Sequence, residues 1–208
     1  MTRILLLRHG ETTAPDRFHG CESDVDLSAR GQAQAGAAAA LIAPLAPRAI
    51  YSSTLRRAVA TAAPIARACG LVPRTVEALH ERRMGPLSGA PRDEFWDIYE
   101  EAKSHWAAFD LDHSHPGGES FAEIRDRVVP AFTGLAAAHP GETIVVVAHG
   151  VVIRVLLCTL VEGLCPADFG SIPLDYVRVH DLRVEDDTWR LVGNLLPEVA
   201  ASPEAGQW

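Results

Sequence analysis

The chain has 208 residues, of which 48% are hydrophobic and 22% charged, and its formal net charge at pH 7 is −8. This composition is typical of a soluble globular protein, and no apolar stretch approaches the roughly 18 residues that a membrane span requires. The acidic balance disfavours nucleic acid and anionic membranes as partners, because binding to them requires a basic stripe. Any phosphate that the protein binds must therefore be held by a local cluster of arginines.

The length suits one domain, and the composition does not change along the chain. We expect a single domain over residues 1–208, with a loose tail at about residues 197–208. No export signal precedes the first predicted strand, so a cytoplasmic location is expected. Four cysteines lie far apart without CxxC spacing, which favours reduced thiols over disulfides or a zinc site: Cys21, Cys69, Cys158 and Cys165.

The first predicted strand is the apolar run of residues 4–7, which ends at Arg8, His9 and Gly10. A short, continuous apolar run before a glycine-containing turn indicates a buried parallel strand. Open α/β sheets bind their ligands at the carboxyl ends of such strands, so Arg8 and His9 are candidate site residues. Taken alone, His9 is explained equally well as a solvated strand end.

A loop, a helix and a second strand are predicted next. The loop at residues 13–26 should cover the ligand-binding edge of the sheet. An alanine-rich helix starts at Ser28 and runs to about Leu41, because alanine is the strongest helix former. Residues 48–53 then read as a strand that leaves into a turn.

The helix after this strand carries Arg56 and Arg57 in its first turn, with Ser53 or Thr54 as the expected N-cap. The helix macrodipole disfavours cations at this end and favours anions. An anion bound to one of the two arginines would remove the conflict. The spacing Leu-x-Arg-Ala favours Arg57 as that residue.

Further along the chain, the patterns predict a short strand, two helices and the loops that join them. They fall in the order strand 71–76, loop 79–89, helix 95–109, loop 110–120 and helix 121–138. The loop at 110–120 contains His113 and His115, a pair that lacks the third ligand a metal site needs. No metal is therefore expected.

A second run of β-branched residues, 143–147, leads into Ala148, His149 and Gly150 and repeats the arrangement of the first strand. Two strands therefore deliver two histidines to one edge of the sheet. This pairing favours a functional site over two unrelated strand ends.

The last elements are a helix at residues 151–161 and a hairpin formed by residues 176–184 and 188–193. The order along the chain is mainly alternating strand and helix. This order predicts a three-layer α/β/α sandwich around a mostly parallel sheet.

Five short motifs occur in order over about residues 3–160, and together they resemble those of the histidine phosphatase superfamily, also called the phosphoglycerate mutase-like family. The motifs are Leu7-Arg8-His9-Gly10-Glu11-Thr12, Ser52-Ser53-Thr54-Leu55-Arg56-Arg57-Ala58 followed by Thr61-Ala62, Leu79-His80-Glu81, Gly117-Gly118-Glu119-Ser120 and Ala148-His149-Gly150. The resemblance implies the phosphoglycerate mutase-like fold and an enzyme that works through a phosphohistidine.

The same resemblance implies a role for each of nine residues. His9 is the implied nucleophile, Glu81 the implied proton donor, and the implied phosphate pocket consists of Arg8, Arg57 and His149. Further substrate contacts are expected from Thr12, Arg17, Glu119 and Gly150. No cofactor is expected.

These residue types suit phosphoryl transfer on chemical grounds. The reaction requires that the phosphoryl group be positioned and its spreading charge neutralised, and the planar fork of a guanidinium matches phosphate oxygens. His9 must attack as neutral imidazole, so a backbone acceptor should hold the proton of its other ring nitrogen. Covalent capture then divides one difficult displacement into two easier ones, and a protonated His149 would add positive charge to the pocket.

Glu81 is the least straightforward of these assignments. Arg82 and Arg83 beside it favour the charged carboxylate, whereas a general acid must hold a proton. A bound phosphate dianion would favour the protonated form and so arm the acid in the complex. Glu119 is the substitute candidate for proton donor.

Two other functions stay open beside phosphatase. Cofactor-dependent mutases are similar around Glu81, but Met84 stands where they carry a tyrosine, and the Gly-Gly-Glu-Ser run favours the phosphatase branch, which includes broad-specificity and α-ribazole phosphatases. The third hypothesis is a non-catalytic protein with the same fold that binds a phosphorylated ligand. The substrate is expected to be a small phosphorylated metabolite, selected by loops at residues 13–26 and 82–120, with the C-terminal tail as a further candidate. Its identity and the oligomeric state, for which a dimer is one option, stay open.

Overall fold

The computed structural model describes residues 1–197. The helices and strands alternate along most of this range, as the sequence predicts. They are β1 (Thr2–Arg8), α1 (Ala29–Ile42), β2 (Ala49–Ser52), α2 (Arg56–Cys69), β3 (Arg74–Thr75), α3 (Arg92–Ala107), α4 (Phe121–Ala137), β4 (Thr143–Ala148), α5 (Gly150–Leu160), β5 (Val179–Glu185) and β6 (Thr188–Leu195), with short 3-10 helices at η1 (Ala43–Leu45), η2 (Glu77–Leu79), η3 (Gly85–Leu87) and η4 (Pro166–Asp168). The tail predicted past Pro197 lies outside the described residues.

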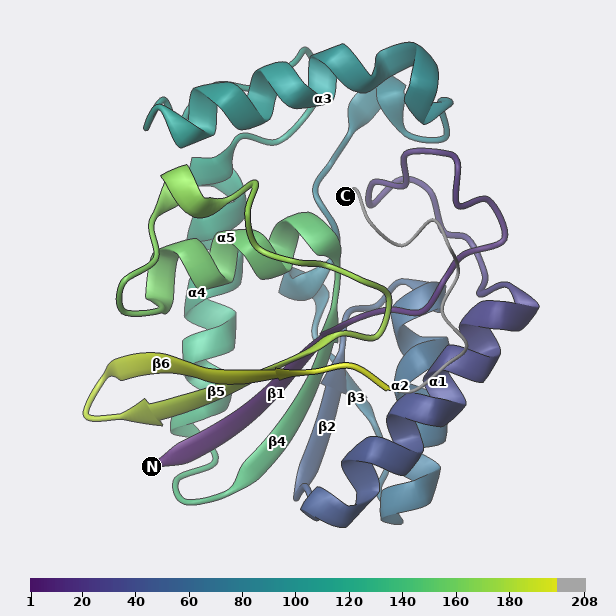
Figure 1. The fold of residues 1–208 in the computed structure, drawn as a ribbon, viewed down its shortest axis with the longest axis vertical. Helices are drawn as coiled ribbons and strands as arrows, with labels where there is room; N and C mark the ends of the chain where they lie inside the picture. The colour runs from purple at the N-terminus through teal and green to yellow at the C-terminus, as the bar shows by residue number, and fades with distance from the viewer. Residues whose placement is uncertain (198–208) are drawn as a thin grey trace.

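One sheet with the order β3-β2-β4-β1-β5-β6 forms the centre of the molecule. The strands β1, β2, β3 and β4 are parallel, whereas β5 is antiparallel to β1 and to β6. Helices α1 and α2 cover one face, helices α4 and α5 cover the other, and α3 lies across the carboxyl ends of the parallel strands (Figure 1). The predicted mostly parallel sheet between two helical layers is confirmed. No helix within residues 1–197 is long and apolar enough to cross a membrane.

The apolar run in β1 is buried on both faces of the sheet. Ile4 and Leu6 belong to the core that packs on α4 and α5, and Leu5 and Leu7 belong to the core that packs on α1 and α2. All four side chains are 0% exposed. A parallel strand covered on both faces has no polar alternation, which is why the run could be recognised from the sequence.

The helix starts confirm one prediction and correct another. The helix predicted to start at Ser28 is α1, which Ser28 caps by accepting a hydrogen bond of 3.0 Å from the Gly31 amide. For α2 the N-cap is Leu55, not Ser53 or Thr54, and its side chain makes no cap hydrogen bond. Ser53 Oγ accepts a hydrogen bond from the Leu55 amide while it also contacts the histidine at the end of β4.

The strand predicted at residues 71–76 is shorter in the structure, where β3 comprises only Arg74 and Thr75. Its first residues serve the end of α2, because Gly70 adopts a left-handed conformation and the Leu71 amide donates to the Ala66 carbonyl. This arrangement satisfies carbonyls at the helix terminus that would otherwise lack partners. The preceding helix therefore uses residues that the apolar pattern assigned to the strand.

The predicted hairpin is confirmed, with β5 and β6 joined at Asp186 and Asp187. Both residues have positive φ values, 48° and 61°. Two such residues in a two-residue loop match the twist of the flanking strands. The helix predicted at residues 95–109 begins earlier, at Arg92, and ends at Ala107.

Candidate active site

The register of the sheet places the two strand-terminal histidines side by side. Arg8 on β1 pairs with Ala148 on β4, so His9 and His149 follow at the same level on neighbouring strands. Their ring centroids are 5.2 Å apart, and the side chains are 6% and 0% exposed. The two histidines that were predicted to meet at this edge of the sheet therefore lie side by side and are buried.

His9 has the tautomer that a nucleophile needs. Its Nδ1 atom lies 2.7 Å from the Gly10 carbonyl oxygen, and because that oxygen can only accept, Nδ1 carries the proton and Nε2 keeps its lone pair. Burial, followed by the charges of Arg57 and Arg8, lowers the pKa of His9 well below its ordinary value. The imidazole is thus neutral at physiological pH.

Arg8 and Arg57 are held in place by backbone carbonyls. Arg8 Nη1 donates to Leu174 O at 2.6 Å, and its guanidinium lies 4.3 Å from the centre of the Tyr176 ring. Arg57 is 0% exposed, and its Nη1 donates to Ser23 O at 2.7 Å. Burial lowers the pKa of Arg57 to about 10, so the side chain stays charged. No carboxylate of residues 1–197 forms an ion pair with either guanidinium.

The three residues of the predicted phosphate pocket each have a buried nitrogen without a hydrogen-bond partner among the described residues. These nitrogens are Arg8 Nε, Arg57 Nε and His149 Nδ1. A buried donor without a partner costs about 1–3 kcal/mol, and a charged one costs more. The charges of Arg57 and Arg8 act on both His9 and His149, whose rings are neighbours, so the three residues lie around one place. An anion with several oxygens is the ligand that satisfies them together.

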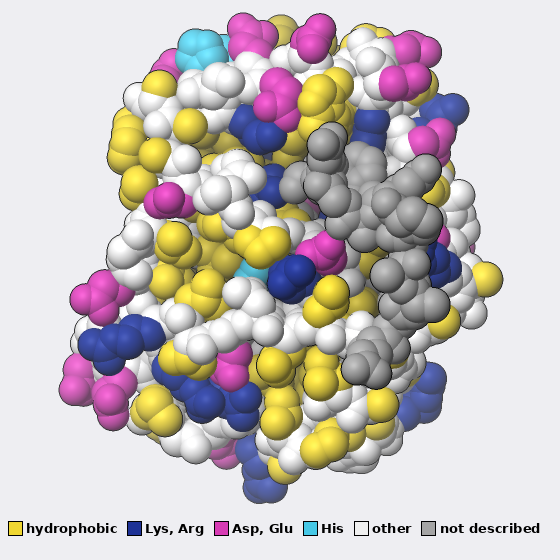
Figure 2. All heavy atoms as spheres, in the orientation of Figure 1, with side chains coloured by type: hydrophobic (Ala, Val, Ile, Leu, Met, Phe, Trp, Pro, Cys, Tyr) yellow, Lys and Arg dark blue, Asp and Glu magenta, His cyan; other side chains and the backbone are white. Residues whose placement is uncertain are grey.

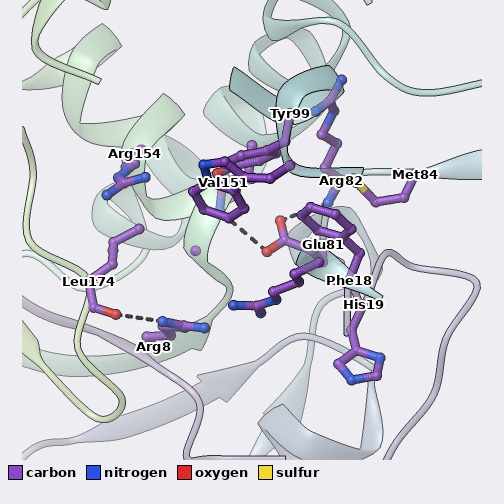
Figure 3. Close-up of a pocket in the computed structure, with 13 residues that line it drawn as sticks. Arg8, Phe18, His19, Glu81, Arg82, Met84, Tyr99, Val151, Arg154 and Leu174 are labelled. Carbon is purple, nitrogen blue, oxygen red and sulfur yellow. Dashed lines mark hydrogen bonds between the residues drawn. The ribbon is translucent and has the colours of Figure 1, made fainter. Parts of the chain in front are cut away.

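Glu81 lines a pocket together with Arg8 and Gly150, and its side chain lies beside the first turn of α5 (Figure 3). Its Oε1 accepts a hydrogen bond of 2.8 Å from the Arg82 amide, and its Oε2 accepts one of 3.3 Å from the Val151 amide. An added Cβ on Gly150 would lie 3.9 Å from both Arg8 Nε and Glu81 Oε2. The carboxyl group and one phosphate-pocket guanidinium therefore flank Gly150 closely enough to share one small ligand.

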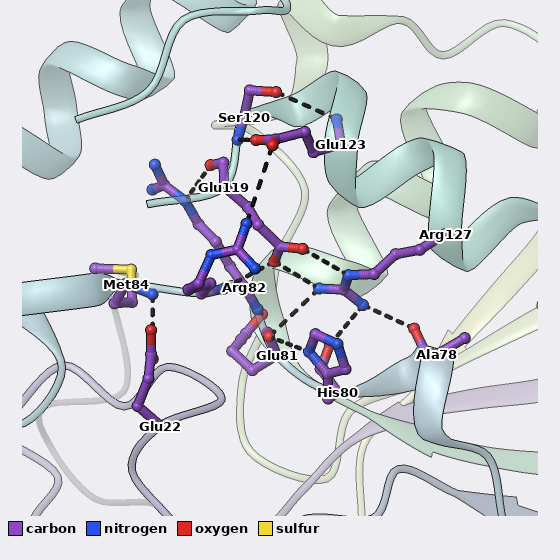
Figure 4. A network of polar contacts seen from close by, with 11 residues as sticks. Glu22, Ala78, His80, Glu81, Arg82, Met84, Glu119, Ser120, Glu123 and Arg127 are labelled. Carbon is purple, nitrogen blue, oxygen red and sulfur yellow. Dashed lines mark hydrogen bonds and ion pairs between the residues drawn. The ribbon is translucent and has the colours of Figure 1, made fainter. Parts of the chain in front are cut away.

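Arg127 on α4 fixes the segment that carries Glu81 (Figure 4). Its Nη1 donates to Ala78 O at 2.7 Å and to His80 O at 2.9 Å, and its Nη2 donates to Glu81 O at 3.3 Å. The same guanidinium forms a two-pronged ion pair with Glu119, at 2.9 Å for each hydrogen bond. One side chain thus determines where the backbone of residues 78–81 lies.

Glu119 was expected to contact substrate and to serve as the alternative proton donor, and the structure does not bring it to the pocket. Burial raises the pKa of Glu119, but hydrogen bonds from Arg127 and the Arg83 amide outweigh that effect and keep the pKa below its usual value. A carboxylate bound in this way does not supply a proton. Glu81 is the carboxyl group that lines the pocket.

Of the other residues expected to contact substrate, one lines the pocket and two do not. Gly150 lines the pocket, whereas Arg17 is exposed and donates to Gly89 O at 2.7 Å. Thr12 is 2% exposed and is not among the lining residues; its backbone pairs with Leu27, and its Oγ1 has no hydrogen-bond partner among residues 1–197. Arg92, whose Nε donates to Arg17 O at 2.9 Å, lines the pocket.

Arg56 and Arg57 separate as the spacing predicts. Arg56 is exposed and forms an ion pair with Asp26, while Arg57 is fully buried beside the histidines. The histidine pair of the 110–120 loop separates too. His115 uses one ring nitrogen toward Arg82 and the other toward the Met84 carbonyl, which leaves none for a metal that it would share with His113.

Residues of both 13–26 and 82–120 line the pocket, and the C-terminal tail lies outside the described residues; the part that these segments play in substrate selection stays a prediction. Figure 2 shows basic, acidic and histidine side chains together near the middle of this face, below α3. The sequence analysis did not identify several residues that line the pocket or contact its residues. They are Ser53, Arg92, Arg127, Arg154 and Tyr176. Arg154 carried a signal, because it is one charged residue in an otherwise apolar helix, whereas Arg127 lies in a charged stretch that resembles a solvated helix face.

The described fold and site define an α/β protein with buried arginines and a neutral histidine at the carboxyl edge of its sheet. The profile of the histidine phosphatase superfamily (branch 1) matches residues 4–194. A metal-independent phosphoserine phosphatase of Arabidopsis thaliana is 35% identical over 201 residues, which is 94% of this chain and 84% of the relative.

Two solved structures share the fold. A mycobacterial glucosyl-3-phosphoglycerate phosphatase with VO3 has a TM-score of 0.80 and 30% identity, and the match covers 92% of this chain and 97% of that one. A phosphoserine phosphatase mutant of Entamoeba histolytica with phosphoserine has a TM-score of 0.81 and 25% identity, over 93% and 96% of the two chains. The chain belongs to the histidine phosphatase superfamily, a fold that supports phosphatase activity.

Proposed function

We propose that this protein hydrolyses small phosphomonoesters without a metal, through a phosphohistidine on Nε2 of His9. The observation that supports this proposal most directly is the set of three buried, unpartnered nitrogens on Arg8, Arg57 and His149 beside a neutral imidazole. Such a set can bind the oxygens of a phosphoryl group and balance the charge that develops on them.

In the first step, the lone pair of His9 Nε2 attacks phosphorus while the bond between phosphorus and the ester oxygen breaks. The departing oxygen takes a proton from Glu81 and leaves as an alcohol. The Gly10 carbonyl holds the proton on Nδ1, which orients the ring and stabilises the positive charge that the imidazole gains. The product of this step is a phosphorus–nitrogen bond at His9.

In the second step, water attacks the phosphorus of the phosphohistidine. Glu81, now a carboxylate, takes a proton from this water, and the electron pair of the phosphorus–nitrogen bond returns to Nε2. Inorganic phosphate leaves, and the neutral imidazole is restored. The same carboxyl group therefore serves as acid and then as base.

His149 acts on the phosphoryl oxygens. Burial, followed by the charges of Arg57 and His9, lowers the pKa of His149 well below its ordinary value, so the ring is neutral before substrate binds. A phosphate dianion reverses the balance of charge around this ring and favours protonation. Ser53 Oγ, 2.6 Å from Nε2, keeps the ring oriented so that Nδ1 faces the ligand.

The substrate we propose is a small phosphorylated metabolite, because the similar proteins named above are phosphatases of phosphoserine and of glucosyl-3-phosphoglycerate. We also place the protein in the cytoplasm. All four cysteines are free thiols, which suits a reducing compartment.

The test measures phosphate release from p-nitrophenyl phosphate in EDTA, together with rapid-quench trapping of an acid-labile phosphoenzyme. We expect turnover and the adduct in the wild type, and loss of both in His9→Ala. Arg57→Ala should lose at least about 100-fold in kcat/KM, since it removes a transition-state charge contact. The matched control is Arg56→Ala, which removes the exposed neighbour and should keep full activity.

Equal rates for wild type and His9→Ala would overturn the proposal. Mutase activity is checked with a phosphoglycerate and its bisphosphorylated cofactor. Isomerisation faster than phosphate release would show that the phosphohistidine returns its group to a second hydroxyl and not to water. Binding without turnover or adduct would identify a phospholigand-binding protein.

A further inference from the structure

A cluster of potential metal ligands lies where α3 ends and the loop at residues 110–120 begins. It consists of Glu101 and His105 on α3 and His113 in the loop. One side-chain ligand atom from each residue lies within 4.8 Å of the other two. None of these three residues is among those that line the pocket, so the cluster is a candidate for a separate site.

Glu101 and His105 lie side by side on α3, because residues four apart on a helix are neighbours on its surface. The adjacent positions Ala102 and Trp106 form the buried face of the helix and are 1% and 0% exposed. Glu101 itself is exposed and His105 is half-buried. A metal ion can therefore reach the carboxylate and the imidazole from solvent.

The chain reverses direction after α3 and so returns His113 to this helix. Phe109 has a φ of 66°, and its amide donates to Trp106 O at 3.0 Å, while the Asp110 amide donates to His105 O at 2.9 Å. These are the two hydrogen bonds of a Schellman motif. Trp106 Nε1 also donates to His113 O at 2.9 Å. The backbone that carries His113 is thus fixed beside the last turn of α3.

The rings of His105 and His113 lie face to face. Their centroids are 3.6 Å apart, and their planes differ by 4°. This arrangement holds two imidazoles within reach of one ion. Because a metal lies in the plane of each imidazole that binds it, the rings must rotate out of the parallel stack on binding. Both side chains are half-buried and not enclosed, so such a rotation is possible.

Asp110 gives His105 the orientation that a metal ligand needs. Its Oδ2 accepts a hydrogen bond of 2.9 Å from His105 Nδ1, which leaves the lone pair of Nε2 for a metal. Histidines that bind metals almost always donate their other ring nitrogen to a carboxylate, a backbone carbonyl or water. His115, by contrast, uses both ring nitrogens elsewhere. The fold thus replaces the sequence pair His113-x-His115 with a different set of ligands.

We propose that Glu101, His105 and His113 bind a zinc ion, with water as the fourth ligand. Two imidazoles and a carboxylate are a set that zinc takes in proteins, whereas magnesium and calcium prefer oxygen ligands. Zinc bonds of about 2.0–2.1 Å require the ligand atoms to move closer together, which the exposed Glu101 side chain can do by rotation. The ion would join α3 to the loop that follows it. The proposed hydrolysis does not use this site.

The test titrates the full-length, untagged protein with zinc chloride in competition with a zinc-binding dye, after EDTA treatment and dialysis. We expect the wild type to bind a single zinc ion per chain. His105→Gln and His113→Gln should each lose at least about 10-fold in affinity, since loss of an outer-shell partner alone costs that much. Asp110→Asn should also weaken binding, because it disturbs the orientation of His105.

The matched control is His139→Gln. The Nδ1 atom of His139 lies 2.6 Å from Glu142 Oε2, so it too pairs with a carboxylate, but it belongs to no group of potential metal ligands among residues 1–197. This variant should keep the wild-type zinc affinity. Glu101→Gln changes an exposed residue and should lose affinity, and it serves as the test if a histidine variant does not fold.

Equal zinc affinity in the wild type, His105→Gln and His113→Gln would overturn the site, whether all of them bind zinc or none does. Loss of binding in His9→Ala with unchanged binding in His105→Gln would place the ion in the phosphate pocket and would overturn it equally. Phosphate release in EDTA tests the proposed hydrolysis separately, so each inference can fail without the other.

Discussion

Gly10 shows how one residue without a side chain keeps the nucleophile in place. A Cβ atom added at this position would lie 2.6 Å from the carbonyl oxygen of Gly31, in the first turn of α1. The contact is with backbone, which cannot rotate away as a side chain would. The Gly10 carbonyl, which accepts the hydrogen bond from His9 Nδ1, is therefore fixed by the close approach of Gly10 to α1.

We expect Gly10→Ala to destabilise the protein by about 1–3 kcal/mol, because the clash forces the backbone to shift, and to reduce kcat by misplacing the imidazole. The matched control is Gly36→Ala, on the exposed side of the same α1 helix, where an added Cβ meets nothing within 4 Å. That change should increase stability by about 0.5–1 kcal/mol. Urea unfolding and p-nitrophenyl phosphate turnover measure both effects. Unchanged turnover in Gly10→Ala would contradict the fixed-peptide argument.

At the scale of elements, the site residues that could be predicted from the sequence are those whose position follows from the pattern of the element that carries them. The runs that end at His9 and His149 specify buried strands, and parallel register then brings the two rings together. The site residues that were missed act from another element, as Arg127 does across 46 residues of chain to the Glu81 carbonyl. Periodicity reports which face of a helix is apolar, but it does not report which backbone carbonyls a surface arginine reaches.

The role of Arg127 as a positioning residue predicts a dependence on the leaving group. Arg127→Met should reduce kcat for alkyl phosphates by about 10–100-fold, because their alkoxide needs the proton of Glu81, and should affect p-nitrophenyl phosphate far less, because its leaving group needs little protonation. Arg125→Met on the same helix is the control. A purely structural role for Arg127 would lower both rates equally, so the ratio of the two substrates decides.

At the scale of the whole molecule, several histidines are buried in their neutral form. Burial and then the charge of Arg178 lower the pKa of His180 on β5 from 6.5 to about 4. His9 and His149 are shifted in the same direction. The unfolded chain therefore binds more protons than the folded protein at mildly acidic pH, and acid favours unfolding.

Stability should thus be full above pH 6.5 and fall as the pH drops from there toward 4, where the folded protein begins to protonate His180. The difference of about 2.5 pKa units corresponds to about 3 kcal/mol from this one residue. His180→Asn should flatten the pH dependence of the unfolding free energy between these limits, measured by urea unfolding. The same slope in variant and wild type would contradict the assignment.

Helix α3 roofs a floor that comes from other parts of the chain. The reacting groups lie at the ends of β1 and β4, in the first turn of α2 and in the segment that carries Glu81, whereas Arg92, Trp96 and Tyr99 belong to α3. The catalytic residues and the residues of α3 that line the pocket thus belong to different segments of the chain. Substitutions in α3 can therefore alter which esters a related enzyme accepts while its catalytic residues stay the same.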